Sequence, residues 1–358
     1  MRVLFFAVNR SPFTVELIDT LYDYLPKGSY LKMILQHSLE KERSHWGEKV
    51  CKNPVDIVKA PNDLLQFFND EKPDVIIYTS YRSPKFMEAK KWALDNHVKF
   101  FVNASEKLIE YRKSPLFVLL KYQLFRYRTK GVNGVLAISN RAMDLYQKYC
   151  DAPTMVVPYT FDMTRLLNFT PLPYDGMNLT FLISGRLEPF RDPIYSIKMF
   201  AELKSLRPNI NMNLIISGKG SLYEEIKQLL KDLKIEECTT WMNDFKQWTE
   251  IHEIYKKAHI LLCFQEYGGW GLIVPEAMAA GMLVACSMGV DSGDNCIIDG
   301  YNGLYCNRKD RKTTISAMLE TIDNPEEMKI IRQRARETAK YGDVRYYSKR
   351  LSQFIQDN

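Results

Sequence analysis

Short apolar runs alternate with segments of helical periodicity along the whole chain. Such runs fit strands that are buried on both faces, and the helices between them carry the chain back so that the strands lie parallel. The alternation therefore predicts an α/β fold built on parallel sheets. In the first half the expected strands are Arg2–Val8, Tyr30–Leu35, Val55–Val58, Val75–Tyr78, Lys99–Val102, Gly134–Ile138 and Thr154–Val157, with helices such as Phe13–Tyr24, Asn62–Asn69, Pro84–Asn96 and Asn140–Tyr149 between them.

The 358 residues suffice for two domains of ordinary size. The segment 166–178 is rich in proline and other turn residues, and we interpret it as the linker between the domains. We therefore expect a first domain over residues 1–165 and a second over residues 179–340. A last helical pattern covers Val344–Ile355.

The charge is unevenly distributed between the two halves. Residues 1–165 carry 25 Lys and Arg against 18 Asp and Glu, whereas residues 166–358 carry 24 against 25. The excess of positive charge in the first half favours an anionic partner there. Because no nucleic-acid-binding motif is present, we expect an anionic phospholipid or a lipid-linked pyrophosphate as that partner rather than a nucleic acid.

The cysteines and histidines argue against disulfides and metal sites. The seven cysteines are an odd number without CxxC spacing, and the five histidines show no metal-ligand spacing. No apolar run reaches the roughly 18 residues that a membrane-spanning helix needs. The short apolar start is interpreted as a first strand rather than a signal peptide. We therefore expect a cytoplasmic protein without a metal.

The segment Gln265–Gly281, QEYGGWGLIVPEAMAAG, places a glycine-rich loop before a helix. Glycine lacks a Cβ, so the backbone can approach a phosphate closely, and the free N–H groups of a helix start attract anions. Pro275 suits the first helical position, and Glu276 is then expected at the mouth of the site, near vicinal hydroxyls. Phosphate beside hydroxyls indicates a nucleotide sugar. The alternative is an ordinary strand–loop–helix corner with a capping Glu.

A second motif, Phe181–Arg191 or FLISGRLEPFR, begins as a short buried-strand candidate and ends in Gly185 and Arg186. A second cation follows at Arg191. Arginine offers phosphate a planar, bidentate fork, so this pair suits an anionic ligand. The alternative is two surface arginines after a strand.

Together these segments resemble the retaining GT-B glycosyltransferases of glycosyltransferase family 4, the glycosyl transferases group 1. The family signature has a Glu, seven residues, a second Glu and then Ala-Met-Ala-x-Gly. Glu276 matches the second Glu, whereas Gly268 stands at the first. Arg186 matches the family's Gly-Arg, and Arg191 stands where the family has Lys. The resemblance runs in order over about residues 178–307.

The resemblance implies a GT-B fold, in which two Rossmann-like domains face each other across a cleft and a C-terminal helix of about 341–358 packs back on the first. The first domain would bind the acceptor and the second the nucleotide-sugar donor. Arg186 and Arg191 would clamp the donor diphosphate and stabilise its growing charge, and Glu276 would hold the ribose. Glu266, two residues before the missing Glu, is the candidate for contacting the sugar. The other expected donor-binding residues are Gly185, Gly218, Gly269, Trp270, Gly271 and Leu272.

On the acceptor side, Ser105 and Glu106 resemble a Ser-Glu pair of some family members, which is followed by an Arg and then by Lys121. Glu106 is therefore the candidate catalytic residue on the acceptor side. The alternative is a helix cap at Ser105 with Glu106 in the first turn of that helix.

The segment Pro115–Lys130, PLFVLLKYQLFRYRTK, is apolar with interleaved cations. On a helix its apolar side chains share one stripe, formed by Phe117, Leu120, Leu124 and Tyr127. Its cations do not form one clean opposite face; they include Lys121, Arg126 and Arg128. The segment is either a core helix whose cations reach solvent or an interfacial helix that contacts an anionic inner leaflet.

The expected function is that of a retaining hexosyltransferase, which moves a sugar from a UDP or GDP sugar to a saccharide or lipid-linked saccharide. By resemblance it needs no metal or other cofactor, and its setting is bacterial surface polysaccharide assembly. Three alternatives stay open. They are a sugar-nucleotide epimerase of the same fold, a catalytically inactive nucleotide-sugar-binding protein, which Gly268 favours, and a nicotinamide-dependent oxidoreductase, for which Ser217–Gly220 is a weak match.

Overall fold

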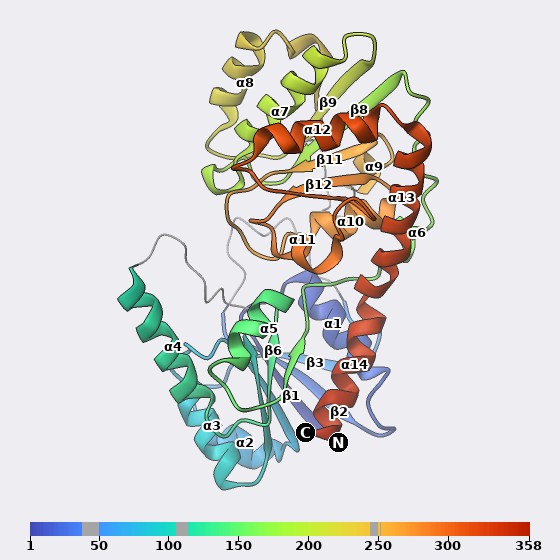
Figure 1. The fold of residues 1–358 in the computed structure, drawn as a ribbon. Coiled ribbons are helices and arrows are strands. Elements are labelled where there is room, and N and C mark those ends of the chain that lie inside the picture. Colours follow the sequence, from blue (N-terminus) through green and yellow to red (C-terminus); the bar gives the residue numbers. More distant parts are fainter. Residues whose placement is uncertain (38–49, 105–113, 244–249, 251) are drawn as a thin grey trace. The chain divides into compact units, whose positions relative to one another are not determined.

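The computed structural model describes residues 1–37, 50–104, 114–243, 250 and 252–358, and Figure 1 shows its fold. The chain divides into two compact units. Unit 1 consists of Met1–Asp162 together with Asp343–Asn358, and unit 2 of Met163–Gly342. Each unit is an α/β body around a parallel sheet, which confirms the fold class that the alternation of strands and helices predicts.

Unit 1 holds a seven-stranded sheet of order β3-β2-β1-β4-β5-β6-β7, in which every described pairing is parallel. Its strands are apolar on both faces because helices cover both sides of the sheet. The strands are β1 (Arg2–Ala7), β2 (Tyr30–Leu35), β3 (Val55–Lys59), β4 (Val75–Thr79), β5 (Lys99–Ala104), β6 (Gly134–Ala137) and β7 (Thr154–Val156). The helices are α1 (Pro12–Tyr22), α2 (Leu64–Glu71), α3 (Phe86–Asp95), α4 (Pro115–Thr129), α5 (Asn140–Gln147) and α14 (Val344–Asp357).

Alternate residues of these strands contribute to two separate cores. Val3 and Phe5 of β1 pack in the core that α1 and α14 cover. Leu4 and Phe6 pack in the other core, which α2, α3, α4 and α5 cover. This alternation follows from the period of two along a strand, and it explains why the strand sequences are almost continuously apolar.

The last helix of the chain returns to unit 1, where α14 lies along α1 (Figure 1). The Ser348 hydroxyl donates a hydrogen bond to the Leu17 carbonyl oxygen at 3.3 Å. The Phe354 ring packs on Phe101 of β5 with 5.8 Å between the ring centroids. Gly134 makes room for that ring, since a Cβ at this position would lie 2.7 Å from Phe354. The C-terminal helix is therefore part of the core of unit 1.

Unit 2 holds a six-stranded parallel sheet of order β10-β9-β8-β11-β12-β13. The strands are β8 (Asn178–Ser184), β9 (Asn211–Ser217), β10 (Thr239–Trp241), β11 (Ile260–Cys263), β12 (Leu283–Ser287) and β13 (Leu304–Cys306). The helices are α6 (Thr164–Leu167), α7 (Pro193–Leu206), α8 (Tyr223–Asp232), α9 (His252–Tyr255), α10 (Ile273–Ala280), α11 (Asp291–Cys296), α12 (Arg311–Ile322) and α13 (Pro325–Ala339). One large apolar core, built on Phe181, Phe200 and Leu214 among others, joins the sheet to α7, α8, α12 and α13.

The chain enters β8 through residues 168–177, which form neither helix nor strand. Buried His259 fixes this segment. Its Nδ1 accepts a hydrogen bond from the Thr180 N–H at 2.9 Å, and its Nε2 lies 3.0 Å from the Pro173 carbonyl oxygen. Because Nδ1 must accept, the proton of the neutral ring sits on Nε2. Burial lowers the pKa of His259, which keeps this neutral form.

Most elements begin and end within two residues of their predicted bounds. Among the helices that the structure describes, none combines the length and the apolar character needed to cross a bilayer.

Candidate functional site

The two motifs of the second half, Phe181–Arg191 and Gln265–Gly281, meet at the switch point of the unit 2 sheet. The chain runs outward from β8 to β9 and β10, and then returns to the other side of β8 as β11. In open parallel sheets, ligands bind outside the carboxyl ends of strands at such a reversal. The loop 185–191 follows β8 and the loop 264–272 follows β11, so both motifs lie at this edge.

Glycines bring the backbones of the loops after β8 and β9 into contact. Gly185 and Gly218 have φ values of 123° and 150°. A Cβ on Gly218 would lie 1.8 Å from the Gly185 carbonyl oxygen. A Cβ on Gly220 would lie 2.3 Å from the Leu187 carbonyl oxygen. Gly185 has no heavy atom within 4 Å of its own Cβ position, so one side of this backbone is open. Of the glycines predicted for donor binding, Gly218 is required by the close contact between the two backbones. Gly185 leaves free space beside its backbone.

The two predicted arginines lie against one aromatic ring. The guanidinium carbons of Arg186 and Arg191 are 5.4 and 5.5 Å from the centre of the Phe190 ring. Arg186 is exposed, whereas burial and then the positive charge of Arg186 lower the pKa of Arg191. Arginine stays protonated despite such shifts. Within the described ranges, neither guanidinium pairs with a carboxylate. The edge of the sheet therefore presents two neighbouring cations that form no ion pair with a carboxylate of the described residues.

Gln265 holds the buried arginine, and sequence reasoning missed it. The Gln265 Oε1 accepts a hydrogen bond from Arg191 Nη1 at 2.7 Å, and its Nε2 donates to the Gly289 carbonyl oxygen at 3.3 Å. Gln265 is 1% exposed. A Cβ on Gly268 would lie 2.5 Å from the Gln265 amide nitrogen. The glycine at the first Glu position of the signature thus leaves space that the Gln265 amide occupies. A polar residue at the end of an apolar strand was the only sequence signal for it.

Glu276 is buried in a polar contact rather than open at a mouth. It is 6% exposed, and its Oε2 accepts a hydrogen bond from the Tyr255 hydroxyl at 2.6 Å. The Nε2 of His252 lies 3.6 Å from Oε1. Burial and then the Glu276 carboxylate raise the pKa of Tyr255 well above its ordinary value, so the phenol keeps its proton and donates. Both partners come from α9, and the sequence motifs did not predict them.

The Gly-Trp-Gly turn is anchored on the start of α11. Gly271 has a φ of 79°, and its carbonyl oxygen accepts a hydrogen bond from the Ser292 hydroxyl at 2.7 Å. The Ser292 N–H donates to the Trp270 carbonyl oxygen at 2.8 Å. Gly269 is exposed and has no heavy atom near its Cβ position. The turn thus offers open backbone at Gly269 while its other residues are held in place.

The helix after this turn begins at Ile273, with the partly exposed Leu272 as its N-cap. The prediction that Pro275 takes the first helical position was therefore wrong, because Pro275 is the third helical residue. All N–H groups of a first turn lack a partner inside the helix, so proline is tolerated at each of these positions. The motif alone does not distinguish them.

Three buried polar atoms at the carboxyl edge of the unit 2 sheet have no hydrogen-bond partner among the described residues. They are the Ser184 hydroxyl, at the carboxyl end of β8, the Trp270 indole N–H and the Arg191 Nε. Buried polar groups without partners are rare in folded proteins. These three atoms lie at the end of β8 or on the loops after β8 and β11. Arg186 and Arg191, on the first of these loops, have no carboxylate partner in the described part of the chain, and this is the pattern expected of a site that a polar, anionic ligand completes.

The other predicted residues are placed as follows. Glu266 is exposed directly after Gln265. Ser105 and Glu106 lie outside the described residues. In unit 1, Lys121 is 5% exposed, Arg126 is exposed, and Arg128 donates a hydrogen bond to the Tyr81 carbonyl oxygen at 2.6 Å. Within the described part of the chain, no three His, Cys, Asp or Glu side chains are grouped so that they could hold a metal ion.

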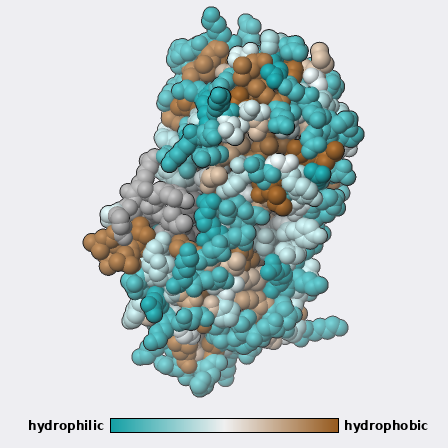
Figure 2. Space-filling view, viewed as in Figure 1, coloured by the Kyte–Doolittle hydropathy of each residue, from teal (hydrophilic) through white to brown (hydrophobic). Residues whose placement is uncertain are grey.

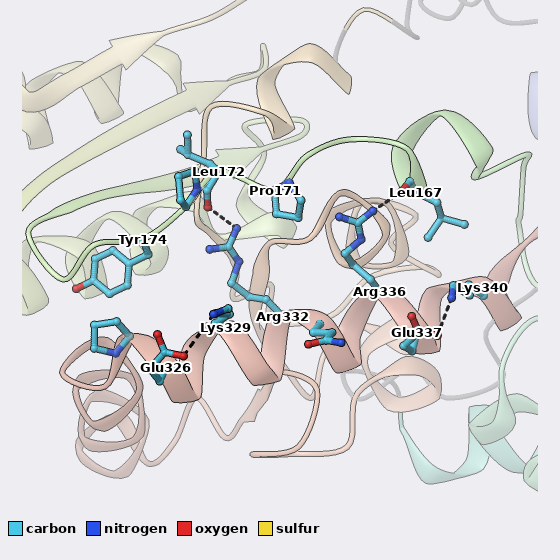
Figure 3. Close-up of a pocket in the computed structure, with 13 residues that line it drawn as sticks. Leu167, Pro171, Leu172, Tyr174, Glu326, Lys329, Arg332, Arg336, Glu337 and Lys340 are labelled. Atoms are coloured by element: carbon cyan, nitrogen blue, oxygen red, sulfur yellow. Dashed lines mark hydrogen bonds and ion pairs between the residues drawn. The ribbon is translucent and has the colours of Figure 1, made fainter.

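A cavity of about 650 Å³ lies elsewhere in unit 2, between the linker segment and α13 (Figure 3). Arg332 donates hydrogen bonds to the carbonyl oxygens of Gly281 and Leu172, at 2.6 and 2.7 Å. Arg336 donates to the carbonyl oxygens of Phe169, at 2.9 Å, and Leu167. None of the residues predicted to bind a donor lines this cavity. Its arginines attach the linker to α13, so we place the candidate site at the sheet edge and not here.

Comparison with known proteins agrees with these motifs. Residues 168–338 match the family model described as glycosyl transferases group 1. The chain is 25% identical over 132 residues to an uncharacterized glycosyltransferase of Methanocaldococcus jannaschii, covering 37% of each chain. It is 25% identical over 146 residues to the D-inositol 3-phosphate glycosyltransferase of Corynebacterium glutamicum, covering 40% of this chain and 34% of the relative. The match thus spans little more than a third of the length of these curated relatives.

Solved structures share the fold over the whole chain. HepE of Anabaena in complex with UDP has a TM-score of 0.75 at 14% identity, and the alignment covers 100% of this chain and 100% of HepE. The apo form of the lipopolysaccharide outer core galactosyltransferase WaaB has a TM-score of 0.74 at 16% identity, covering 100% of this chain and 99% of WaaB. The predicted GT-B fold is confirmed. The family match and the fold together support the glycosyltransferase family that the motifs resemble.

Proposed function

We propose that this protein is a retaining glycosyltransferase, which transfers a hexose from a nucleoside-diphosphate sugar to a hydroxyl of a saccharide or lipid-linked saccharide. The observation that carries this proposal is the pair Arg186 and Arg191, two cations without a carboxylate partner among the described residues, beside open glycine backbone at the switch point of the unit 2 sheet. This combination suits a diphosphate, and the match to the glycosyl transferases group 1 model covers the same segment.

In this proposal the two arginines bind the donor diphosphate and stabilise the charge that it gains as the leaving group. Arg191 is largely shielded from water, so its attraction for phosphate is weakly screened. The hydrogen bond from Arg191 to Gln265 fixes its orientation before the donor arrives. A fixed cation that needs no reorganisation is an efficient way to stabilise a developing charge. No metal is needed for this role.

Glu276 is proposed to hold the ribose. Its Oε2 is fixed by the Tyr255 hydroxyl, which sets the direction of the carboxylate. Ribose hydroxyls are donors, and a carboxylate oxygen is the strongest acceptor available to them. Because Glu276 lies in the first turn of α10, directly after the Gly-Trp-Gly turn, it stands close in sequence to the open backbone at Gly269.

The proposed reaction breaks the bond between the sugar C1 and the phosphate oxygen and forms a bond between C1 and the acceptor oxygen on the same face of the sugar. The acceptor hydroxyl proton passes to the leaving phosphate oxygen, so the products are the glycoside and the nucleoside diphosphate. No protein base is required in this scheme. Glu266 and Glu106 remain candidates for contacts with the sugar and the acceptor.

We propose a UDP sugar as the donor in preference to a GDP sugar. HepE was crystallised with UDP and with UDP-glucose, and WaaB is named a galactosyltransferase. The acceptor is proposed to be a saccharide or a lipid-pyrophosphate-linked saccharide of a bacterial surface polysaccharide. The basic first half of the chain, with 25 cations against 18 anions over residues 1–165, favours such an anionic acceptor.

Product analysis with UDP-glucose, UDP-galactose and GDP-mannose tests the proposal. We expect release of the nucleoside diphosphate to depend on a saccharide acceptor, and the product to keep the anomeric configuration of the donor. An inverted product would contradict the retaining mechanism. Conversion of the nucleotide sugar without an acceptor would favour the epimerase. Donor binding without turnover by any acceptor would favour the inactive binding protein, as Gly268 suggests.

A further inference from the structure

Helix α4 turns its apolar side toward solvent. Three of its side chains are more than half exposed, with Leu116 at 66%, Leu120 at 60% and Tyr127 at 67%. The helical period places these three on one face. The neighbouring apolar side chains on this face are exposed as well; they are Phe117, Leu119 and Leu124. Figure 2 shows a hydrophobic patch at the left edge of the view, where the first half of α4 lies in Figure 1.

The opposite side of α4 fixes the helix to unit 1. The buried Phe125 ring stacks on Tyr146 with 4.6 Å between the centroids and contacts the Tyr81 ring at 5.2 Å. Lys121 and Thr129 are also buried on this side. A surface helix of a soluble protein places its apolar stripe inward and its charges outward. In α4 a lysine is inside and six apolar side chains are outside.

All charged side chains of α4 itself are positive. Arg126 and Lys130 are exposed at one edge of the apolar face. Residues 111–143 contain seven Lys and Arg but no Asp or Glu. A second copy of the chain would bring the same basic segment against its own, which like-charge repulsion disfavours. The complementary partner has an apolar interior beneath a layer of negative charge, and an anionic bilayer has this construction.

We propose that α4 is an interfacial helix, which binds unit 1 to the surface of an anionic lipid bilayer. The exposed leucines and aromatic rings enter the boundary between headgroups and acyl chains, and Arg126 and Lys130 contact lipid phosphates. This inference does not depend on the glycosyltransferase assignment. If both hold, the helix brings the enzyme to the surface where lipid-linked acceptors reside.

Sedimentation with vesicles tests the proposal on the full chain. Vesicles of equal parts phosphatidylglycerol and phosphatidylcholine are compared with vesicles of phosphatidylcholine alone. We expect binding to the anionic vesicles, and at least about a tenfold lower partition coefficient for the double variant Leu116→Gln/Leu120→Gln, because both side chains lose their burial in lipid. The matched control is Leu65→Gln/Leu206→Gln, which changes two leucines of similar exposed character, 40% and 45% exposed, outside α4. We expect this control to bind like the parent.

A second variant isolates the electrostatic contribution. The change Arg126→Glu/Lys130→Glu should lower binding to the anionic vesicles at least about tenfold, and added salt should weaken binding of the parent. Because these side chains are exposed, the melting temperatures of all variants should match that of the parent. If the leucine variant has a lower melting temperature than the parent, the Tyr127→Trp variant provides the test in its place. A blue shift of its tryptophan fluorescence on addition of anionic vesicles would support insertion of α4.

Three results would overturn the proposal. The first is no binding of the parent to anionic vesicles. The second is binding that persists unchanged in the Leu116→Gln/Leu120→Gln variant or an unchanged emission spectrum of Tyr127→Trp. The third is self-association of the parent that this leucine variant abolishes while vesicle binding is absent, which would make a second copy of the chain the occupant.

Discussion

Replacement of Arg191 by methionine should affect stability and ligand binding in opposite directions. Arg191 is a largely buried cation, and among the described residues its guanidinium donates one hydrogen bond, to Gln265, and pairs with no carboxylate. Replacing buried charge by an apolar side chain of similar volume gains about 1–4 kcal/mol. The lost hydrogen bond costs about 1 kcal/mol. The ligand-free Arg191→Met variant should therefore be as stable as the parent or up to about 3 kcal/mol more stable.

The same variant should lose most of its stabilisation by UDP. Loss of a charge-assisted phosphate contact weakens binding about 10²-fold. At a UDP concentration of about 100 times the parent dissociation constant, the parent gains about 2.7 kcal/mol, and a ligand that binds 10²-fold more weakly leaves only about 0.4 kcal/mol. Urea unfolding with and without UDP measures both quantities in one experiment.

Arg332→Met is the control for this reasoning. Arg332 is also buried, but its guanidinium donates hydrogen bonds to two backbone carbonyl oxygens. Methionine at this position would leave both carbonyl oxygens without their donor, at about 1–3 kcal/mol each, and the middle of the summed range exceeds the middle of the range gained by removing the buried charge. We therefore expect a decrease of about 2 kcal/mol in unfolding free energy and an unchanged gain from UDP. If Arg191→Met is destabilised like Arg332→Met and keeps its gain from UDP, Arg191 has a structural role and the donor site is misplaced.

Three further predictions concern the same unit. Gly218→Ala should destabilise the protein by at least about 2 kcal/mol in urea unfolding, because its Cβ would lie 1.8 Å from the Gly185 carbonyl oxygen; a stable variant would show that these loops separate easily. Tyr255→Phe should reduce turnover about tenfold or more by releasing Glu276, whose Oε2 accepts the 2.6 Å hydrogen bond; unchanged steady-state rates would refute the positioning role. Burial lowers the pKa of His259 below its ordinary 6.5, so the unfolded chain binds the proton first as pH falls. The unfolding free energy should therefore decrease below about pH 6.5, and His259→Gln should show a smaller decrease; an equal slope in the variant would contradict this assignment.

The sheet strands could be predicted because burial on both faces leaves an unmistakable sequence pattern. Runs such as Phe181–Ile183 have few polar residues, and helices between them have a different period. The ends of elements are set by single hydrogen bonds. The start of α10 at Ile273, rather than at Pro275, follows from the turn at Gly271, and no residue type in the motif specifies it.

The cations of the candidate site could be predicted from sequence, but their partners could not. Arg186 and Arg191 stand in a short motif after a strand. Gln265 meets Arg191 across 74 residues of sequence, and Tyr255 meets Glu276 across 21. Such contacts depend on which strands are neighbours in the sheet. That order is a long-range property that local patterns do not encode.

Helix α4 shows a further limit of periodicity. The stripe of Phe117, Leu120, Leu124 and Tyr127 is real, but the period alone does not say whether a stripe faces the core or solvent. In the structure these four side chains are 37–67% exposed, and Phe125 on the opposite side is buried. The anchoring contacts of Phe125 with Tyr146 and Tyr81 decide the orientation.

The central claim is that a nucleoside diphosphate binds at the β8 and β11 edge of unit 2. Thermal melts of the parent and of Arg186→Met with UDP, GDP, ADP and NAD at matched concentration test it most directly. Arg186 is exposed and has no described carboxylate partner, so its replacement should leave the ligand-free melting temperature unchanged. We predict that UDP or GDP raises the melting temperature of the parent, that NAD does not, and that Arg186→Met loses most of the increase. Stabilisation by NAD alone, by no nucleotide, or to the same extent in Arg186→Met would contradict the claim.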